Sequence, residues 1–207
     1  MIRRPAAQAL LVGCALWLAA CAPMAVKPDV AAVPVAAEQA AWDARRTALQ
    51  KLTVFSLQGR LAESGIISFG GSLSWRQDGE NLEVRFYGPL GVGAVNLRGT
   101  LGALQVQTKD GSYLTNSPED LMQQKLGWSL PVEGLRWWVL GLPSPETEAK
   151  SLQLDAAGRV QSMEQDGWQL EYTDYQPVNG LDLPHKFSLN NPARGFHLVI
   201  DLWSDVR

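Results

Sequence analysis

TVFSLQGRLA, residues 53–62, alternates apolar and polar side chains and decides the fold class. Phe55 and Leu57 fall on one side of an extended chain, while Ser56 and Gln58 fall on the other. A period of two is typical of a half-buried β-strand. The segment therefore predicts a strand with one face toward an apolar interior.

The same alternation recurs in short segments along most of the chain. Turns that contain glycine, such as Gln77-Asp78-Gly79, separate these segments, which favours strands joined in meander order. We expect ten or eleven strands, at residues 53–61, 69–76, 82–86, 95–98, 104–108, around 113, 152–154, 160–165, 168–175, 183–189 and 196–203.

Residues 38–52 break the alternation with the longer period of a helix. They are rich in alanine and leucine, and they place Trp42, Leu49 and Leu52 near one face. We expect one amphipathic helix before the first strand.

A second helical region interrupts the strands between residues 117 and 142. Residues 117–120, Ser-Pro-Glu-Asp, combine a capping residue, a proline in the first turn and acids near the positive end of the helix dipole. This pattern predicts a short helix that ends near Leu126. Another helix is expected from Pro131 through Leu140.

These elements predict an α+β fold that is mainly β: an incomplete, half-open antiparallel β-barrel of about eleven strands. The helical pair carries Trp128, Trp137 and Trp138, so we expect it to cover the concave face as a lid over an apolar cavity suited to acyl chains. A core filled by its own side chains is the alternative that the sequence leaves open. The candidate cavity residues are Phe55, Leu57, Phe69, Leu73, Trp75, Leu82, Val84, Phe86, Trp137 and Trp138.

The N-terminus has the pattern of an export signal. Arg3 and Arg4 precede an apolar run over residues 10–18, and small residues then lead to Cys21. The segment 18–21, Leu-Ala-Ala-Cys, resembles the lipobox of bacterial lipoproteins, in which the cysteine thiol receives a diacylglyceryl group. An ordinary export signal with a chance cysteine is the alternative. The other cysteine lies within the signal, so Cys21 lacks a disulfide partner, which favours lipidation.

The chain therefore divides into three predicted parts. Residues 1–20 are a signal that is removed, and residues 21–37 are the lipidated N-terminus with a flexible tether that contains three prolines. Residues 38–207 are long enough for a single folded domain. Removal of the signal with Arg3 and Arg4 moves the formal net charge from −3 to −5, which argues against a nucleic-acid partner and against attachment through anionic headgroups. Membrane attachment is therefore expected to rest on acyl chains and apolar contacts.

The sequence offers little support for catalysis. His185 and His197 are each isolated from any cysteine or paired carboxylate at ligand spacing, which disfavours a metal site or a general base. Ser72 and Ser74 lie in a predicted strand and lack the frame of a nucleophile elbow. We therefore expect neither an enzyme nor a cofactor or metal.

One loop stands apart from the alternating segments. Residues 87–93 join two strands and frame Leu90 between glycines and Pro89, residues that favour a tight, protruding turn. Leu90 either folds back onto the core or projects into solvent, where an apolar tip can enter lipid.

Taken together, these features resemble the LolB family over nearly the whole chain after the signal. The segment over residues 135–143 is the most specific part of the resemblance, whereas Arg45 stands where relatives often have histidine. The matching stretches are Trp42, Leu49, Leu52, Phe55 and Gly59-Arg60, the loop Pro89-Leu90-Gly91, and residues 135–143 and 190–203.

The resemblance implies a receptor that accepts triacylated lipoproteins from the periplasmic carrier LolA and inserts them into the inner leaflet of the outer membrane. It assigns membrane insertion to the loop Pro89, Leu90 and Gly91, and it implies a half-barrel with a helical lid. The receptor is expected to be a monomer on the periplasmic face, held in outer-membrane phospholipid by lipidated Cys21, with Ala22 as an outer-membrane sorting signal. The alternatives are another anchored lipid-binding or structural lipoprotein, an anchored periplasmic hydrolase, and the soluble carrier itself.

Overall fold

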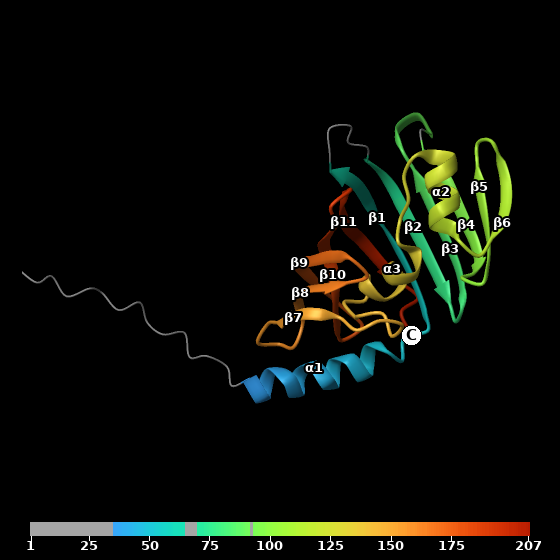
Figure 1. The fold of residues 1–207 in the computed structure, drawn as a ribbon. Coiled ribbons are helices and arrows are strands. Elements are labelled where there is room, and N and C mark those ends of the chain that lie inside the picture. The colour runs from blue at the N-terminus through green and yellow to red at the C-terminus, as the bar shows by residue number, and fades with distance from the viewer. Residues whose placement is uncertain (1–34, 65–69, 92) are drawn as a thin grey trace, which may run out of the picture. The chain divides into compact units, whose positions relative to one another are not determined.

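Eleven strands form one antiparallel sheet in a computed structural model of the chain (Figure 1). The structure describes residues 35–64, 70–91 and 93–207. The predicted signal, Cys21, most of the predicted tether and Phe69 lie outside these residues. The strands are β1 Val54–Ser64, β2 Gly70–Asp78, β3 Asn81–Tyr87, β4 Val95–Thr100, β5 Ala103–Thr108, β6 Gly111–Thr115, β7 Lys150–Leu154, β8 Val160–Gln165, β9 Trp168–Val178, β10 Leu181–Asn190 and β11 Gly195–Ser204.

The sheet is curved but not closed. Its strand order is β6-β5-β4-β3-β2-β1-β11-β10-β9-β8-β7, so β6 and β7 form its two edges and β1 pairs with β11 in the middle. Within the described residues, no ladder joins β6 to β7. The predicted half-open barrel of about eleven strands with helices is confirmed, and the meander order is broken only where the central strands β1 and β11 pair.

Three α-helices accompany the sheet: α1 Val35–Leu49, α2 Pro118–Leu126 and α3 Val132–Trp138. The first begins before the predicted start at residue 38, so residues 35–37 of the predicted tether are helical. The third ends at Trp138 rather than at Leu140, because the chain turns at Gly141, which has a φ of +73°. Among the described residues, no helix is both long and apolar enough to cross a membrane.

Helix α1 is fastened to the sheet through one face. Trp42 and Leu49 are buried, as their spacing predicts. Gly158, in the turn between β7 and β8, lies so close that a Cβ there would sit 2.4 Å from the backbone nitrogen of Trp42. Arg45 donates a hydrogen bond to the backbone oxygen of Asp182, in β10. Arg45 therefore attaches α1 to the sheet.

A β-bulge interrupts the pairing of β1 with β11. Gln58 faces Leu202 and Gly59 faces Ile200, so one extra residue of β11, Asp201, is left between them. The bulge turns Trp203 inward, where its ring meets that of Phe55 edge to face at 5.7 Å. It leaves Asp201 and Leu202 exposed on the outer face of the sheet.

Candidate functional site

The inner face of the sheet and the inner sides of α2 and α3 enclose an apolar interior. Nine of the ten predicted cavity residues are described, and all nine face this interior or its rim. Trp137 is half-buried at the surface of α3, whereas the others are buried: Phe55, Leu57, Leu73, Trp75, Leu82, Val84, Phe86 and Trp138.

In this conformation the side chains fill the interior themselves. Phe55, Leu57, Phe86 and Trp138 are at most 1% exposed, which leaves no room beside them for even a water molecule. Of the two alternatives that the sequence left open, the described conformation has the filled interior. An acyl chain can enter only if part of the lid moves away from the sheet.

Helix α3, the second lid helix, is held to the sheet by a buried glutamine. Oε1 of Gln165, at the end of β8, accepts hydrogen bonds from Nε1 of Trp138 and from the backbone nitrogen of Ser144, both at 2.8 Å. Its Nε2 donates to the backbone oxygens of Ser144 at 2.9 Å and Thr147 at 2.7 Å. All four hydrogen-bonding positions of this amide are therefore occupied, although the residue is only 2% exposed.

A tyrosine adds a second buried attachment. The hydroxyl of Tyr172, in β9, donates a hydrogen bond of 2.8 Å to the backbone oxygen of Trp138. Burial raises the pKa of Tyr172, which keeps the hydroxyl protonated and able to donate. At the other end of the sheet, Nη2 of Arg136 donates to the backbone oxygen of Gly79 at 3.0 Å. Helix α3 is thus fixed to both halves of the sheet.

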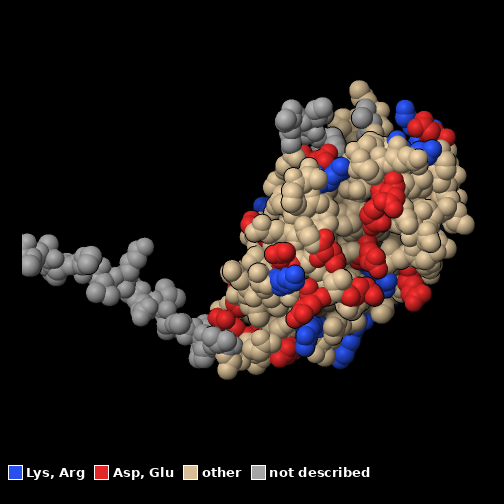
Figure 2. Space-filling model, in the orientation of Figure 1, with Lys and Arg blue, Asp and Glu red and all other residues tan. Residues whose placement is uncertain are grey.

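Helix α2 is attached more loosely. Met122 is buried beneath it, but its polar contacts with the sheet lie at the surface. They are an exposed hydrogen bond of 2.8 Å from Nη2 of Arg194 to Oε1 of Gln123, and Nζ of Lys125 4.7 Å from the centre of the Tyr113 ring in β6. Gly127, in the left-handed conformation, ends the helix. Figure 2 shows acidic side chains scattered across the face that carries α2 and α3, with no continuous basic patch there. The surface attachment makes α2 the part of the lid that can move at the smaller free-energy cost.

Glu119 links the two lid helices. Its carboxylate accepts a hydrogen bond of 2.9 Å from the backbone nitrogen of Val132, at the start of α3. Burial raises the pKa of Glu119, so carrying the charged form destabilises the folded state. This destabilisation is absent below the pKa that Glu119 has in the unfolded chain. It appears as the pH rises through the higher pKa that Glu119 has in the folded protein.

We expect Glu119→Gln to be at least as stable as the wild type at pH 7, because the amide oxygen keeps the hydrogen bond without the buried charge. The advantage over the wild type should shrink as the pH falls toward 4, where Glu119 becomes neutral. Glu119→Ala should lose about 1 kcal/mol through the unpaired backbone nitrogen. Thermal unfolding at pH 7 and at pH 4 compares the wild type with the two variants. Glu148→Gln is the control, because Glu148 is exposed and is not among the groups that shift the pKa of Glu119. A Glu119→Gln variant as unstable as the alanine variant contradicts this account.

The loop between β3 and β4 presents a leucine to solvent. A short 3-10 turn, Pro89–Gly91, is closed by a hydrogen bond of 3.0 Å from the backbone nitrogen of Gly91 to the oxygen of Gly88. Leu90 is fully exposed, and its backbone lies in the left-handed region at φ +55° and ψ +22°. A large apolar side chain in that conformation is strained as well as exposed. The loop therefore holds an unfavourable arrangement, because burial of the Leu90 side chain among the described residues does not offset the strain.

Ser72 and His197 line the same groove on the outer face of the sheet, but no hydrogen bond joins them among the described residues. Nδ1 of His185 lies 2.8 Å from the backbone oxygen of Ile200, and His197 is exposed on the outer face. Ser72 is an exposed residue of β2. Within the part of the chain that the structure describes, no group of three histidine, cysteine, aspartate or glutamate side chains is arranged to hold a metal ion.

A comparison with protein families explains this combination of sheet, lid and loop. The family model described as "Outer membrane lipoprotein LolB" matches residues 53–203. The chain belongs to the LolB family. The matched residues run from the start of β1 into β11 and include both lid helices and the Leu90 loop, whereas α1 precedes them.

Curated LolB proteins align with most of the chain. Over 190 residues it is 38% identical to the outer-membrane lipoprotein LolB of Nitrosococcus oceani, covering 91% of this chain and 92% of that protein. The LolB of Pseudomonas paraeruginosa is 40% identical over 164 residues, covering 78% and 80%. The LolB of Pseudomonas fluorescens is 38% identical over 166 residues, covering 79% and 80%.

Two buried glutamines of this LolB-family chain were not among the predicted site residues. Gln165 holds α3, and Gln77 accepts a hydrogen bond of 3.0 Å from Nε1 of Trp75 while donating to the backbone oxygen of Gly79. Both occupy inward positions of an alternating strand, where an apolar residue is expected. A polar residue at an inward strand position is the signal in the sequence that could have revealed these two glutamines.

Proposed function

We propose that this LolB-family protein is an outer-membrane receptor that accepts triacylated lipoproteins from the periplasmic carrier LolA and inserts them into the inner leaflet of the outer membrane. It acts as a monomer, anchored on the periplasmic face through lipidated Cys21. The observation that carries the proposal is an apolar interior closed by two helices of which only α3 is fixed by buried hydrogen bonds. Because the chain belongs to the LolB family, we infer that the acyl chains of lipoproteins occupy this interior.

The physical problem is the exposure of hydrocarbon to water. Burial is worth about 0.8 kcal/mol per methylene, so an acyl chain of around sixteen carbons in water costs on the order of 12 kcal/mol. Spontaneous transfer between carrier and bilayer is therefore too slow. A receptor whose interior matches the carrier's in polarity lets the chain pass in nearly balanced steps, without covalent chemistry or nucleotide hydrolysis.

Loading begins with the displacement of α2. Its movement breaks the exposed Arg194–Gln123 hydrogen bond and the Glu119–Val132 hydrogen bond to α3, and it withdraws Met122 from the interior. Gln165 and Tyr172 meanwhile keep α3 on the sheet. The acyl chain then replaces contacts that α2 made with the sheet. Because one apolar surface substitutes for another, the open state is favoured when cargo is present.

The test is to lock α2 against the sheet. In Gln123→Cys/Arg194→Cys, a reducible bifunctional thiol reagent with the reach of the two original side chains joins α2 to the turn between β10 and β11. We expect the locked protein to take up no fluorescent acyl probe and to accept no lipoprotein from LolA. Reduction of the link should restore both activities, because the lock removes only the movement of the helix.

The two single-cysteine variants, treated with the same reagent, control for the modification. The lipidated form of Cys21 has no free thiol, so the introduced pair alone reacts. Unchanged uptake by the locked protein refutes the proposed opening of α2. Failure of the wild-type protein to accept lipoproteins refutes the receptor function itself.

A further inference from the structure

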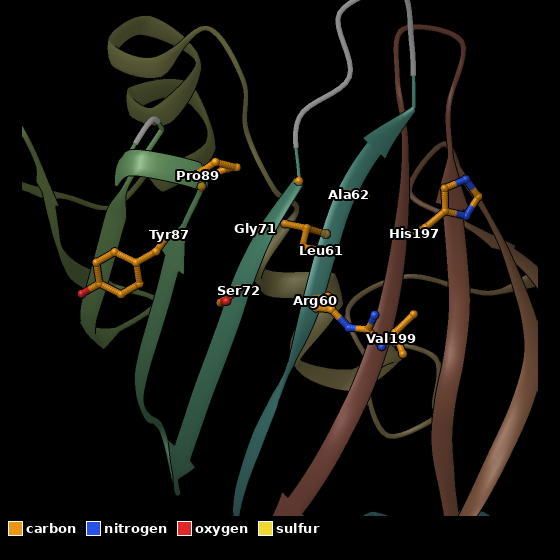
Figure 3. Close-up of a pocket in the computed structure, with 11 residues that line it drawn as sticks. Arg60, Leu61, Ala62, Gly71, Ser72, Tyr87, Pro89, His197 and Val199 are labelled. Carbon is orange, nitrogen blue, oxygen red and sulfur yellow. The ribbon is translucent and has the colours of Figure 1, made fainter.

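A shallow groove lies on the outer face of the sheet, opposite the apolar interior (Figure 3). Its volume is about 690 Å³, within the range of about 300–1,000 Å³ that is typical of small-molecule sites. The backbone of Gly70, Gly71 and Gly88 and the small side chains of Ala62 and Ser72 form its floor. Larger side chains of Arg60, Tyr87, His197 and Val199 also line the groove, so the small residues leave space above the sheet between them.

The groove forms where β2 and β3 separate. Their last pair is Ser72 with Tyr87, beyond which β3 enters the Leu90 loop while β2 remains paired with β1. Gly70, on the same side of β2 as Ser72, has no side chain to fill the space, and a Cβ there would meet no atom closer than 3.5 Å. At Gly71 the two strands still approach closely, because a Cβ there would lie 2.3 Å from the backbone oxygen of Tyr87. Pro89 bounds the groove, so one end of it lies directly beside Leu90.

The other end of the groove is polar. A smaller hollow of about 390 Å³ continues it along β1 and shares Arg60, Ser72 and Tyr87 with it. Asp201, which the bulge in β11 leaves on this face, lines the hollow. Nη2 of Arg60 lies 2.8 Å from Oδ1 of Asp201, and its Nε lies 3.1 Å from Oδ2. An apolar end beside Leu90 thus leads to an adjacent acid and base.

We propose that this groove seats one zwitterionic phospholipid of the target membrane, with its phosphate at Arg60, its ammonium at Asp201 and its upper acyl chain over Ala62 and the glycine floor. The inference rests on the proposed function, which turns the Leu90 end toward the bilayer. In that orientation the apolar end of the groove meets the acyl layer and the Arg60–Asp201 pair lies at the height of the headgroups. The polarity of the groove then matches that of a leaflet.

The net negative charge of the chain favours a zwitterionic phospholipid over an anionic one. The chain has a formal net charge of −3, so anionic headgroups are repelled, whereas a headgroup with one charge of each sign is not. Arg60 and Asp201 are 66% and 48% exposed, and an ion pair of that kind contributes little to stability. Both side chains can therefore give up part of their interaction with each other and bind the headgroup with little loss of stability. A guanidinium also matches the geometry of a phosphate well.

The experiment uses the full lipidated protein in vesicles of phosphatidylethanolamine that contain a photoactivatable phosphatidylethanolamine, reactive in its upper acyl chain. After irradiation, mass spectrometry locates the label, which we expect at residues 60–62 and 70–72. Ala62→Trp fills the groove and should lower that labelling about tenfold, which corresponds to about 1.4 kcal/mol. Gln105→Trp, at an exposed position of β5, is the matched control and should leave it unchanged.

A charge reversal separates headgroup binding from a merely structural ion pair. Arg60→Asp combined with Asp201→Arg keeps the pair but reverses its order, so we expect labelling to fall as it does in Ala62→Trp. Unchanged labelling overturns the headgroup assignment, and stronger labelling from a photoactivatable phosphatidylglycerol overturns the choice of a zwitterion. Labelling that avoids the groove while lipoprotein transfer proceeds overturns the groove alone. Absence of transfer overturns the proposed function.

Discussion

Leu90→Glu is expected to abolish the release of lipoproteins into outer-membrane vesicles while cargo still binds to the receptor. Burying a leucine side chain in lipid is worth about 2 kcal/mol, so its loss alone weakens insertion of the loop about thirtyfold. A carboxylate adds a desolvation penalty at the membrane surface. Fluorescent lipoprotein, loaded on LolA and followed into vesicles, separates the two steps, because binding and release are read independently.

The backbone at Leu90 gives a second, sharper form of this prediction. Asparagine tolerates the left-handed conformation better than leucine does. Leu90→Asn should therefore raise the unfolding temperature slightly while it slows release nearly as much as Leu90→Glu does. A gain in stability joined to a loss of transfer indicates that the strained, exposed leucine is retained for function rather than for folding.

Leu114→Glu is the matched control for both variants. Leu114 is also a large exposed apolar residue, 77% exposed, but it lies on the edge strand β6. Its replacement should leave release unchanged. If Leu114→Glu slows release as much as Leu90→Glu does, general surface hydrophobicity and not the loop drives insertion. If Leu90→Glu releases cargo normally, the loop has no part in insertion.

Most of the fold could be predicted because its sequence signals are local. Alternation identified all eleven strands to within a few residues, and residues 117–120 marked the start of α2, although the Ser117 side chain makes no capping hydrogen bond. The loop residues Pro89 and Gly91 predicted a tight turn from their own conformational preferences. Each of these signals acts over a few residues, so the sequence carries it without knowledge of the tertiary structure.

The remaining features depend on pairs of residues far apart in the chain. The bulge that exposes Asp201 arises from the register of β11 against β1, about 140 residues away, which no local pattern records. Gln165 is a site residue only because Trp138 and Ser144 return to it from the lid. Whether the interior is filled depends on how the lid helices lie on the sheet, which composition cannot fix.

Gln165→Ala is expected to give the largest loss of stability of any single change considered for this chain. The substitution leaves four groups without their partner. Three are buried, the indole nitrogen of Trp138 and the backbone nitrogen and oxygen of Ser144, and the fourth, the backbone oxygen of Thr147, is part-buried. Each such group costs about 1–3 kcal/mol, but water entering the vacated space satisfies some of them, so we expect a total loss of about 3 kcal/mol. For a domain of this size that lowers the unfolding temperature by about 10 °C.

Thermal unfolding of Gln165→Ala beside Gln161→Ala tests this directly, because Gln161 is an exposed residue of the same strand and should shift the midpoint little. Gln77→Ala, which loses two hydrogen bonds instead of four, should fall between them.

The loss of Gln165 should also change the uptake of acyl chains, because this residue holds α3 of the lid. Once Gln165 no longer holds α3, α3 itself can leave the sheet, so Gln165→Ala should take up an acyl probe even when α2 is locked. Two results would show that α3 is held by packing and not by Gln165. One is an unfolding midpoint of Gln165→Ala within about 2 °C of wild type, which is less than the shift for a loss of 1 kcal/mol. The other is a Gln165→Ala variant with α2 locked that still excludes the probe.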